Sequence, residues 1–512
     1  MGGPLFYASV GAIGQNHGVF GVQQPPPQQI IAQGTGVCAL VGQTSWGPSA
    51  GDPDALYHTS GKQNFFNTFQ PLGMNRLNSA YLMALSASYP DLFVVRVTGA
   101  TGTARSTSTV NKAGSIALVT LTLKWVGGEG DKVVATTNLA SDGNVNHFNL
   151  TLSVSSAAGT TSETFENFNV STFGTVFIPD LTNSILLGSV TILSNGVPTM
   201  GSWLFSGGST GAAVTSPDYV GTQGAGTPNK GFGLLEGNDT LRHVFSDDPG
   251  PALRPAVNTG LLNHVNFLLD RTGYMCGPSG QSTAAVQLDV LSFVSTNVVY
   301  TDPWVYVYDD TTGAKQLIPS NFIAASLGAN SSPSTSFAWR NLQLRSLMSA
   351  IVGIEFNRGT TKASNTALGI STIIPFKGGG FCFEAAKVTA QAASASTGNW
   401  TRTQMGIFIA SSVEDALQSD VDQPNVLINQ QEIMGAIDSF LGDLVKNQNI
   451  NPNTSPYIKA YTLQTIDAAN TQASEDGGNF VVAASIKIGS SMERIIFSIT
   501  YGETVVITPI AA

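Results

Sequence analysis

The chain has 512 residues, a formal net charge of −10, and charged side chains at only 11% of its positions. Soluble proteins usually carry about 25% charged residues, so much of this surface consists of Ser, Thr, Asn, Gln and Gly. A neutral surface favours a protein that packs against many copies of itself. The acidic balance without a Lys/Arg cluster argues against nucleic-acid binding, and no apolar run reaches the about 18 residues of a membrane span.

The chain begins with an arm-like segment and continues with an α/β pattern. Residues 5–22 mix aromatic residues with glycines, which predicts an extended segment, and Pro25-Pro26-Pro27 adds a stiff linker. Beyond the linker, apolar runs and capping residues predict a strand, two helices and a second strand, at 37–42, 62–69, 78–89 and 92–97. Strands that alternate with helices are typical of an α/β domain.

The composition changes at Gly99. From 100 to 235 the chain is rich in Thr, Ser, Gly, Asn and Val, and runs such as 116–124 and 148–154 alternate apolar and polar residues. Alternation with a period of two, without a helical pattern, predicts an all-β insertion of the sandwich or barrel type.

Helical periodicity returns after residue 235. The apolar residues of 261–269 fall on one helix face, and the clearest amphipathic pattern predicts a helix at about 430–448. The polar positions of that helix, which we expect to be more exposed, are Glu432, Asp438, Asp443 and Lys446. The other predicted elements are a strand at 298–308, a helix at 337–351, an extended segment at 400–409 and a helix capped by Ser411 or Ser412 that ends near 418.

Both ends of the chain have the pattern of a long, partly apolar, extended arm. Bare apolar strand edges are aggregation hazards, so we expect each arm to pair with the sheet of another subunit. The apolar arm residues are Phe6, Tyr7, Val10, Val19 and Phe20 near the N-terminus and Ile495, Phe497, Ile499, Tyr501, Val505 and Ile507 near the C-terminus.

Patterns that suggest catalysis lack the context that the chemistry requires. Gly47-Pro48-Ser49-Ala50-Gly51 and Gly207-Gly208-Ser209-Thr210-Gly211 match the nucleophile-elbow spacing, but neither joins a strand to a helix. Phe232 follows Gly231 where a phosphate loop needs Lys. We therefore expect a protein that is not an enzyme and binds no cofactor.

Metal-binding and redox patterns are equally incomplete. The histidines lack ligand spacing, and Asp247-Asp248 is an acidic pair without further ligands. Asp309-Asp310-Thr311-Thr312-Gly313 is better explained as a hairpin turn. Cys38, Cys276 and Cys382 are isolated, which predicts buried thiols in a reducing compartment. We expect no metal.

Several short segments are informative through their order rather than individually. They are Gly36–Gly42 with Trp46-Gly47-Pro48, Asn78–Val97 with Phe93-Val94-Val95-Arg96-Val97, Tyr300–Val307 with Ile318-Pro319-Ser320, Gly378–Phe381, Trp400-Thr401-Arg402 with Ile407–Glu414, and Gln423-Pro424-Asn425. In this order they resemble the tail sheath proteins of contractile-tailed bacteriophages and related contractile injection machines. The chain departs from that family in its single Arg402, where the family has an Arg-rich run. It also carries the β insertion, which resembles the outward decorations of larger sheaths.

The resemblance implies a multidomain α/β protein. Its inner α/β sheath domain is built from both chain ends, beside a middle α/β domain, an all-β insertion and extended terminal arms. The implied segments are an N-terminal arm at 1–30, the inner domain at 31–99 and 375–493, the insertion at 100–235, the middle domain at 236–374 and a C-terminal arm at 494–512.

The resemblance also implies a mechanism without nucleotide. Hexameric rings stack helically around a tail tube, each subunit's arms complete a sheet of its neighbours, and contraction drives the tube through the bacterial envelope. The implied partners are other copies of the chain, the tail tube protein, and baseplate and tail-terminator proteins, with no nucleic acid and no direct membrane insertion. The implied location is the virion tail, assembled in the host cytoplasm, with Glu432, Asp438, Asp443 and Lys446 as tube-facing candidates.

Other functions stay open at this point. The sheath of a phage-derived bacteriocin or secretion apparatus differs only in carrying no genome. A capsid or fibre protein would explain the neutral β-rich surface, but not an amphipathic helix between two arms. A Ser hydrolase is disfavoured because neither Ser49 nor Ser209 has the expected context.

Overall fold

The computed structural model divides into two compact units, whose described parts fall within 34–407 and 408–488. Each unit is treated by itself below. The structure describes residues 36–52, 54–59, 65, 68–69, 91–156, 159–170, 176–177, 184–224, 229–308, 313–329, 351–376, 379–394, 397–418, 425–450, 458–464, 470 and 480–488.

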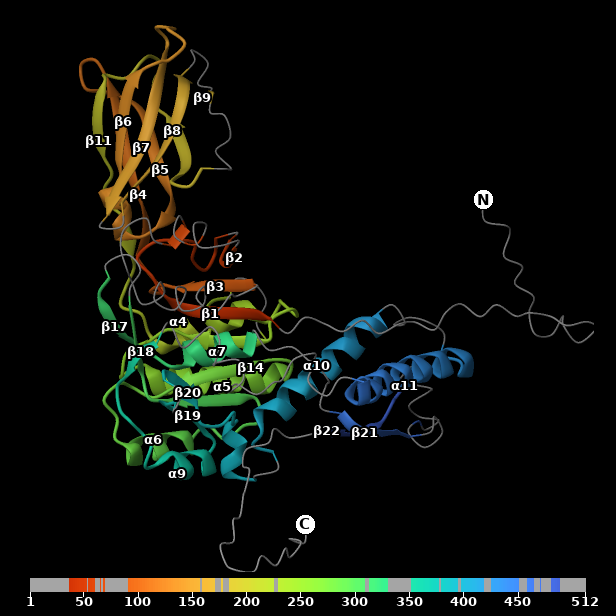
Figure 1. The fold of residues 1–512 in the computed structure, drawn as a ribbon. Coiled ribbons are helices and arrows are strands. Elements are labelled where there is room, and N and C mark those ends of the chain that lie inside the picture. Colours follow the sequence, from red (N-terminus) through yellow and green to blue (C-terminus); the bar gives the residue numbers. More distant parts are fainter. Residues whose placement is uncertain are drawn as a thin grey trace, which may run out of the picture. The chain divides into compact units, whose positions relative to one another are not determined.

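An eight-stranded sheet forms the centre of the larger unit, in the order β2-β3-β1-β13-β14-β15-β19-β20 (Figure 1). The strands from β3 to β19 in this order run parallel, and β2 and β20 pair antiparallel at the two edges. Their bounds are Val37–Gln43 (β1), Leu56–Thr59 (β2), Asp91–Val97 (β3), His243–Ser246 (β13), Thr272–Cys276 (β14), Val298–Asp302 (β15), Ile370–Pro375 (β19) and Phe381–Phe383 (β20).

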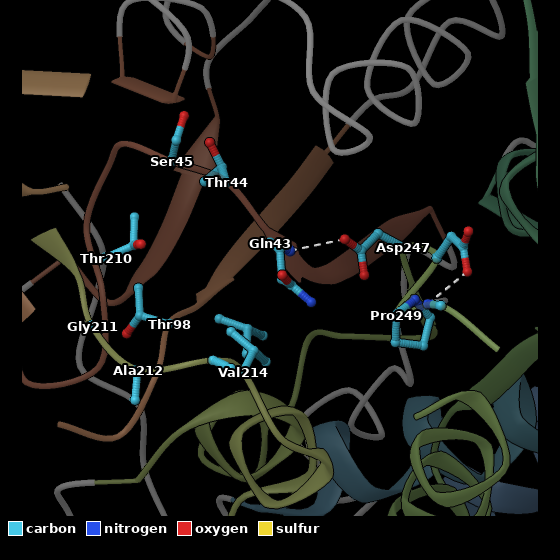
Figure 2. Close-up of a pocket in the computed structure, with 14 residues that line it drawn as sticks. Gln43, Thr44, Ser45, Thr98, Thr210, Gly211, Ala212, Val214, Asp247 and Pro249 are labelled. Carbon is cyan, nitrogen blue, oxygen red and sulfur yellow. Dashed lines mark hydrogen bonds between the residues drawn. The ribbon is translucent and has the colours of Figure 1, made fainter. Parts of the chain in front are cut away.

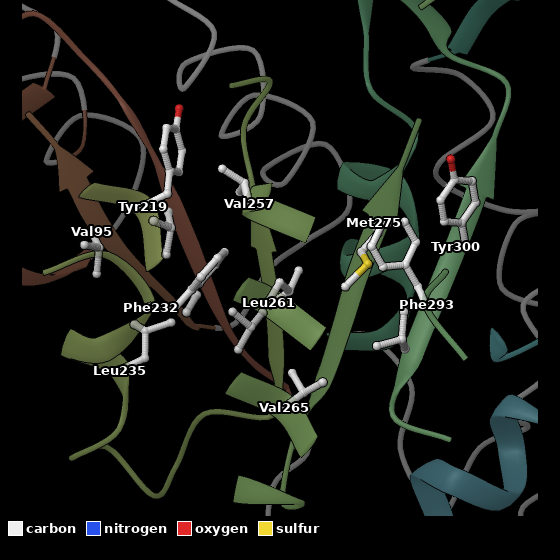
Figure 3. Packing of buried hydrophobic residues seen from close by; sticks show 14 of the residues in the cluster. Val95, Tyr219, Phe232, Leu235, Val257, Leu261, Val265, Met275, Phe293 and Tyr300 are labelled. Atoms are coloured by element: carbon white, nitrogen blue, oxygen red, sulfur yellow. The ribbon is translucent and has the colours of Figure 1, made fainter. Parts of the chain in front are cut away.

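Helices cover both faces of this sheet, as buried parallel strands require. On one face, Leu261 and Val286 join a buried cluster with Val244 of β13. Figure 3 shows part of this cluster, with Leu261 among its members. On the other face, the Phe322 ring lies 5.7 Å from that of Phe245, the next residue of β13. The first face is covered by α4 (Ser216–Val220), η3 (Gly231–Leu235), α5 (Arg254–Leu268) and α6 (Thr283–Val290), and the second by α7 (Asn321–Ala329).

Between β3 and β13 the chain forms two further antiparallel sheets, ordered β10-β5-β4-β12 and β11-β6-β7-β8-β9. Side chains from both, such as Leu121 and Leu150, share one hydrophobic core. The elements are β4 (Thr103–Lys112), β5 (Ile116–Val126), η1 (Gly128–Lys132), β6 (Val134–Leu139), β7 (His147–Ser156), β8 (Gly159–Val170), β9 (Val176–Phe177), β10 (Leu187–Ile192), β11 (Gly201–Leu204) and β12 (Ser209–Thr210).

Smaller elements complete the described chain. The predicted strand at 298–308 is divided at Asp302-Pro303 into β15 and β16 (Val305–Tyr308). β16 pairs antiparallel with β17 (Lys315–Ile318) on either side of the predicted hairpin turn, and with β18 (Ile351–Ile354). The others are α9 (Lys362–Ala367), η4 (Thr389–Ala392), α10 (Trp400–Leu417), α11 (Leu427–Ile450), β21 (Ile458–Leu463) and β22 (Ala484–Ile488). None of the described helices is long and apolar enough to cross a membrane.

The structure corrects the predicted separation of 31–99 from 236–374. β1 pairs with β3 on one edge and with β13 on the other, so both segments contribute to one sheet. An apolar strand has the same pattern whichever neighbour it pairs with, and the sequence therefore did not show this connection. The end of the predicted insertion also differs, since Tyr219 and Phe232 pack in the core of the larger unit.

The predicted extended segment at 400–409 is wrong, because α10 spans Trp400–Leu417 and contains Ser411 and Ser412. Trp400, Gln404 and Phe408 are buried at intervals of four residues, which is the helical repeat. Of the predicted helix at 62–69, the described residues 65, 68 and 69 are helical. The predicted helix at 78–89 and most of that at 337–351 lie outside the described residues.

His264 makes the stability of the fold depend on pH. Burial, followed by the charge of Arg271, lowers the pKa of His264 to about 3. In the unfolded chain the pKa of His264 is about 6.5, so between about pH 3 and pH 6.5 the unfolded chain binds a proton that the folded chain excludes. Stability therefore decreases as the pH is lowered through that window. Between pH 7 and pH 5 we expect His264 to lower the free energy of unfolding by about 2 kcal/mol.

Urea unfolding of the wild type and of His264→Gln at both pH values measures this effect. The variant should lose less stability between pH 7 and pH 5. His58→Gln is the control, because the His58 side chain is half exposed and lies 3.0 Å from Asp91. Equal pH dependence in the wild type and His264→Gln would contradict the prediction.

Candidate functional site

The predicted amphipathic helix is confirmed as α11, the main packing element of the smaller unit. Its buried side chains recur at helical spacing, so one stripe faces the unit's interior. The Phe440 ring lies 6.2 Å from the Phe408 ring of α10, and the same helix contacts β21. The buried stripe consists of Ala436, Ile437, Phe440, Leu441 and Leu444.

β21 and β22 pair antiparallel beside α11 in a two-stranded sheet. Ile458 at the start of β21 is fully buried, which anchors the sheet. Within the described residues no third strand pairs with either one, so each strand keeps one edge of backbone N–H and C=O groups directed away from its partner. A sheet of two strands is only marginally stable by itself, and this arrangement can accept further strands.

Tyr461 joins this sheet to Asp438 of α11. Its hydroxyl donates to Asp438 Oδ1 at 2.8 Å and to Asp438 O at 3.0 Å. The pKa of Tyr461 is raised to about 12, mainly by burial. The hydrogen bond with Asp438 and the negative charges of Asp438 and Asp443 act in the same direction. Glu432, Asp438 and Asp443 are exposed, so α11 presents carboxylates to solvent. Lys446 lies in α11, but its side chain is outside the described part.

Three adjacent apolar residues at the start of α11 were missed by sequence reasoning. Val426, Leu427 and Ile428 are 46%, 58% and 57% exposed. A signal existed, because three consecutive residues cannot all lie on the buried stripe of one helix. Adjacent exposed apolar side chains favour contact with another protein.

The predicted arms lie outside the described residues. This applies to Phe6, Tyr7, Val10, Val19, Phe20, Ile495, Phe497, Ile499, Tyr501, Val505 and Ile507. Their pairing with another subunit stays a prediction.

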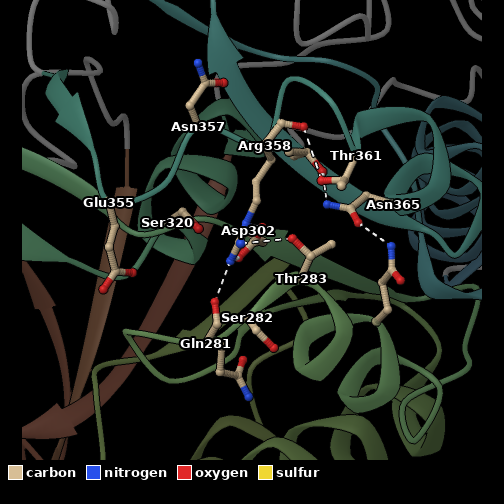
Figure 4. A network of polar contacts seen from close by, with 12 residues as sticks. Gln281, Ser282, Thr283, Asp302, Ser320, Glu355, Asn357, Arg358, Thr361 and Asn365 are labelled. Atoms are coloured by element: carbon tan, nitrogen blue, oxygen red, sulfur yellow. Dashed lines mark hydrogen bonds and ion pairs between the residues drawn. The ribbon is translucent and has the colours of Figure 1, made fainter.

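A buried ion pair lies at the carboxyl end of β15 (Figure 4). Arg358 Nε donates to Asp302 Oδ2 at 2.9 Å, and Nη2 donates to Oδ1 at 3.3 Å. The same guanidinium donates to Thr283 Oγ1 at 3.0 Å and to Gln281 O at 2.7 Å. Burial raises the pKa of Asp302, and Arg358 opposes that rise. The carboxylate is engaged on both oxygens, which suits a structural connection between β15, α6 and the segment after β18.

A cleft of about 660 Å³ opens at the carboxyl ends of β1, β3 and β13 (Figure 2). The sheet extends from β1 toward β3 on one side and β13 on the other, which makes this a topological switch point, where α/β folds commonly bind ligands. Asp247 accepts hydrogen bonds from the Tyr219 hydroxyl at 2.7 Å and from the Gln43 N–H at 2.9 Å. Asp248 pairs with Arg254. Both carboxylates are therefore bound by groups of the protein itself.

The other predicted chemical groups have local contacts. Ser49 Oγ donates to Asp52 Oδ2 at 3.1 Å, and Ser209 Oγ accepts from the Gly211 N–H at 3.0 Å. The three cysteines are buried and form no disulfide bond, and burial raises the pKa of Cys276 to about 11, which keeps that thiol protonated. Among the residues that the structure describes, no group of three or more His, Cys, Asp or Glu side chains is placed to hold a metal ion.

No protein-family model and no curated protein matches the chain, but solved structures do. The sheath tail protein from Desulfitobacterium hafniense matches with a TM-score of 0.57 and 13% identity, over 87% of this chain and 93% of that chain. The sheath tail protein Lin1278 from Listeria innocua matches with a TM-score of 0.58 and 12% identity, over 90% and 93%. The helical sheath of the anti-feeding prophage in its contracted state matches with a TM-score of 0.51 and 13% identity, over 96% and 99%.

The fold is that of a contractile tail sheath protein. The resemblance that the order of motifs indicated is thereby confirmed at the level of the fold. At these low identities the likeness concerns the fold alone. Within the sheath fold, the two-stranded sheet, the carboxylates of α11 and the exposed residues at its start form the candidate assembly surface.

Phe440 tests whether α11 holds the two-stranded sheet in place. Removing its ring leaves a cavity beside Phe408, and buried Phe→Ala changes cost about 3–5 kcal/mol. We expect Phe440→Ala to speed hydrogen exchange of the amides in β21 and β22. Ser439→Ala, at an exposed neighbouring position, is the control. Unchanged exchange in Phe440→Ala would show that the sheet is held by other contacts.

Proposed function

We propose that this chain is the structural subunit of a contractile sheath. Subunits assemble as stacked hexameric rings around a tail tube, and contraction drives the tube through the bacterial envelope. The sheath fold, shared over 87% of this chain and 93% of the Desulfitobacterium protein, is the observation that carries the proposal. A surface with only 11% charged residues supports it, since low charge favours packing between copies.

The arms are proposed to join the subunits. Each arm adds a strand to a sheet of a neighbouring subunit, and the outer edges of β21 and β22 are suitable acceptors. Strand addition satisfies backbone groups of both partners and buries the apolar arm residues. In this proposal 1–30 and 494–512 are the arms, and the segments of the inner domain provide the acceptor sheet.

The proposed partners follow from the same assembly. They are other copies of the chain, the tube protein, and the baseplate and terminator proteins at the two ends of the tail, in a virion assembled in the host cytoplasm. The exposed Glu432, Asp438 and Asp443 are proposed to face the tube, with Lys446 on the same helix. No catalytic step and no nucleotide takes part, because the energy comes from a metastable extended sheath.

A second candidate is the sheath of a phage-derived bacteriocin or secretion apparatus, which carries no genome. The match to the anti-feeding prophage sheath supports this candidate. The nucleic-acid content of purified particles separates the two functions. Closed shells or fibres in electron micrographs would instead support a capsid or fibre protein.

Deletion of either arm tests the assembly. We expect the chains without 1–22 or without 494–512 to stay compact and soluble but to form no tubes, because the acceptor edges lose their strand. Thermal melts report the fold, and sedimentation with electron microscopy reports assembly. Normal tubes from either truncated chain would contradict the proposal, and loss of the monomer fold would show that the arm pairs within its own chain.

A point substitution gives a finer version of this test. A buried Phe→Ala change costs about 3–5 kcal/mol, and Phe497→Ala repeats that cost at every subunit. Assembly should therefore suffer much more than the melting temperature of the monomer. Leu139→Ala, at a position that is 78% exposed in the insertion, is the matched control.

Charge reversal tests the tube-facing assignment. Glu432→Lys with Asp443→Lys leaves the bond between Tyr461 and Asp438 intact. We expect weaker attachment of the extended sheath to its tube, most clearly at low salt, since salt screens exposed charges. Cosedimentation of sheath with tube measures attachment. The exposed Asp54→Lys in the larger unit is the control, and attachment unchanged by the double reversal would refute the assignment.

A further inference from the structure

The β insertion leaves the larger unit's α/β core through two neighbouring segments. The Gly99 N–H donates to Thr210 O at 3.3 Å, and the Ala212 N–H donates to Thr101 O at 2.9 Å. β4 and β12 continue this pairing into the insertion. A connection made only of two paired segments would leave the insertion free to tilt, so its orientation depends on contacts beside them.

Arg96 provides such a contact. It is the next-to-last residue of β3 and is 2% exposed. Its Nε donates to Thr44 O at 2.9 Å, and its Nη1 donates to Gly47 O at 2.5 Å, both in the loop after β1. Nη1 also donates to Val126 O, at the end of β5, at 2.8 Å. One guanidinium therefore bonds the core and the insertion at the same time.

These bonds end on backbone carbonyl groups, not on a carboxylate. Burial lowers the pKa of Arg96 to about 10, and the charge of Asp52 opposes this. The guanidinium stays charged at neutral pH, and hydrogen bonds of a charged donor are stronger than those between neutral groups. Lys cannot reproduce the planar fork that reaches three carbonyl groups.

The surroundings of Arg96 are closely packed. Trp46 follows β1, yet it is 1% exposed within the hydrophobic cluster of the insertion. A Cβ at Gly127 would lie 2.1 Å from Ser45 O, and one at Gly130 would lie 2.7 Å from Trp46 Cζ3. At the rim, Arg105 Nη2 lies 2.7 Å from Asp52 Oδ1. The loop after β1 is thus packed against the insertion, with no space for a side chain at Gly127 or Gly130.

We propose that Arg96 locks the β insertion to the α/β core, so that the two move as one body. This goes beyond the proposed function, because it concerns rigidity within one subunit and holds for an unassembled chain. In a contracting sheath, every displacement of the core would be passed directly to the insertion.

The test measures the distribution of distances between the two parts in the full chain. Spin labels are attached at Val145→Cys in the insertion and Leu288→Cys in α6, which are 83% and 72% exposed. Cys38, Cys276 and Cys382 are buried and should not be labelled. Double electron–electron resonance should give a narrow distribution in this parent protein and a broader one after Arg96→Lys or Arg96→Met.

Two control pairs separate the lock from general damage. Arg105→Met removes an ion pair at the rim, where the side chain is 39% exposed, and should leave the distribution narrow. Gly127→Ala should broaden it, because its Cβ would meet Ser45 O. Gly196→Ala adds a Cβ at a similar positive φ, of 131°, where it would meet only the flexible Lys112 side chain at 3.4 Å, and should not.

Three results would overturn the proposal. One is a distribution that stays narrow in the folded Arg96→Lys, Arg96→Met and Gly127→Ala proteins, with folding checked by circular dichroism. Another is a parent protein whose distribution is already broad. The third is loss of the fold in all three variants, which would mean that these contacts build the core instead of orienting the insertion.

Discussion

The pairing of β1 on both of its edges is the constraint on which the larger unit depends. β1 pairs with β3 from Val37 to Gln43 and with β13 from Cys38 to Val41. Ala39 and Leu40 are fully buried because helices cover both faces of the sheet. The chain must therefore return to β1 after the whole insertion, and loop-closure entropy rises slowly enough with length to permit this. The remaining strands of the sheet lie beyond β3 on one side, where β2 is added, and beyond β13 on the other, where β14, β15, β19 and β20 follow.

The sequence allowed the prediction of elements with a strong local signal. The apolar run of β1 and the periodic stripe of α11 determine a strand and a helix by themselves, and both lie where they were expected. The segment 400–409, the first part of α10, was predicted wrongly because small and polar residues such as Thr401 and Gln404 occupy buried helix positions, which hides the stripe. The helix propensity of individual residues predicts secondary structure only weakly where tertiary contacts decide which side chains are buried. The partners of each strand could not be predicted, because pairing depends on segments that are distant along the chain.

In the candidate site, too, local sequence patterns predict some features, whereas others depend on contacts between segments that are distant along the chain. The helical repeat alone places Glu432, Asp438 and Asp443 away from the buried stripe. The bond from Tyr461 to Asp438 joins two elements separated by a connection with no readable pattern, so only the fold reveals it. With few charges elsewhere on the chain, carboxylates gathered on one helix give that helix a distinct electrostatic character. In the described part of the chain the outer edges of β21 and β22 pair with no further strand, and they add a directional, hydrogen-bonding surface to the same unit.

The switch point of the sheet explains how the insertion is mounted. In α/β folds this position usually receives a ligand, because loops diverge there and leave a crevice. Here the crevice is lined by 210–214, one of the two segments that carry the insertion, and by Thr98 of the other. The end of β1 and the loop after it serve both purposes. The Gln43 N–H donates to Asp247 beside the cleft, while the carbonyl groups of Thr44 and Gly47 accept hydrogen bonds from Arg96. The divergence of strands that creates a ligand site in other α/β proteins thus provides, in this chain, the place where a second domain is attached.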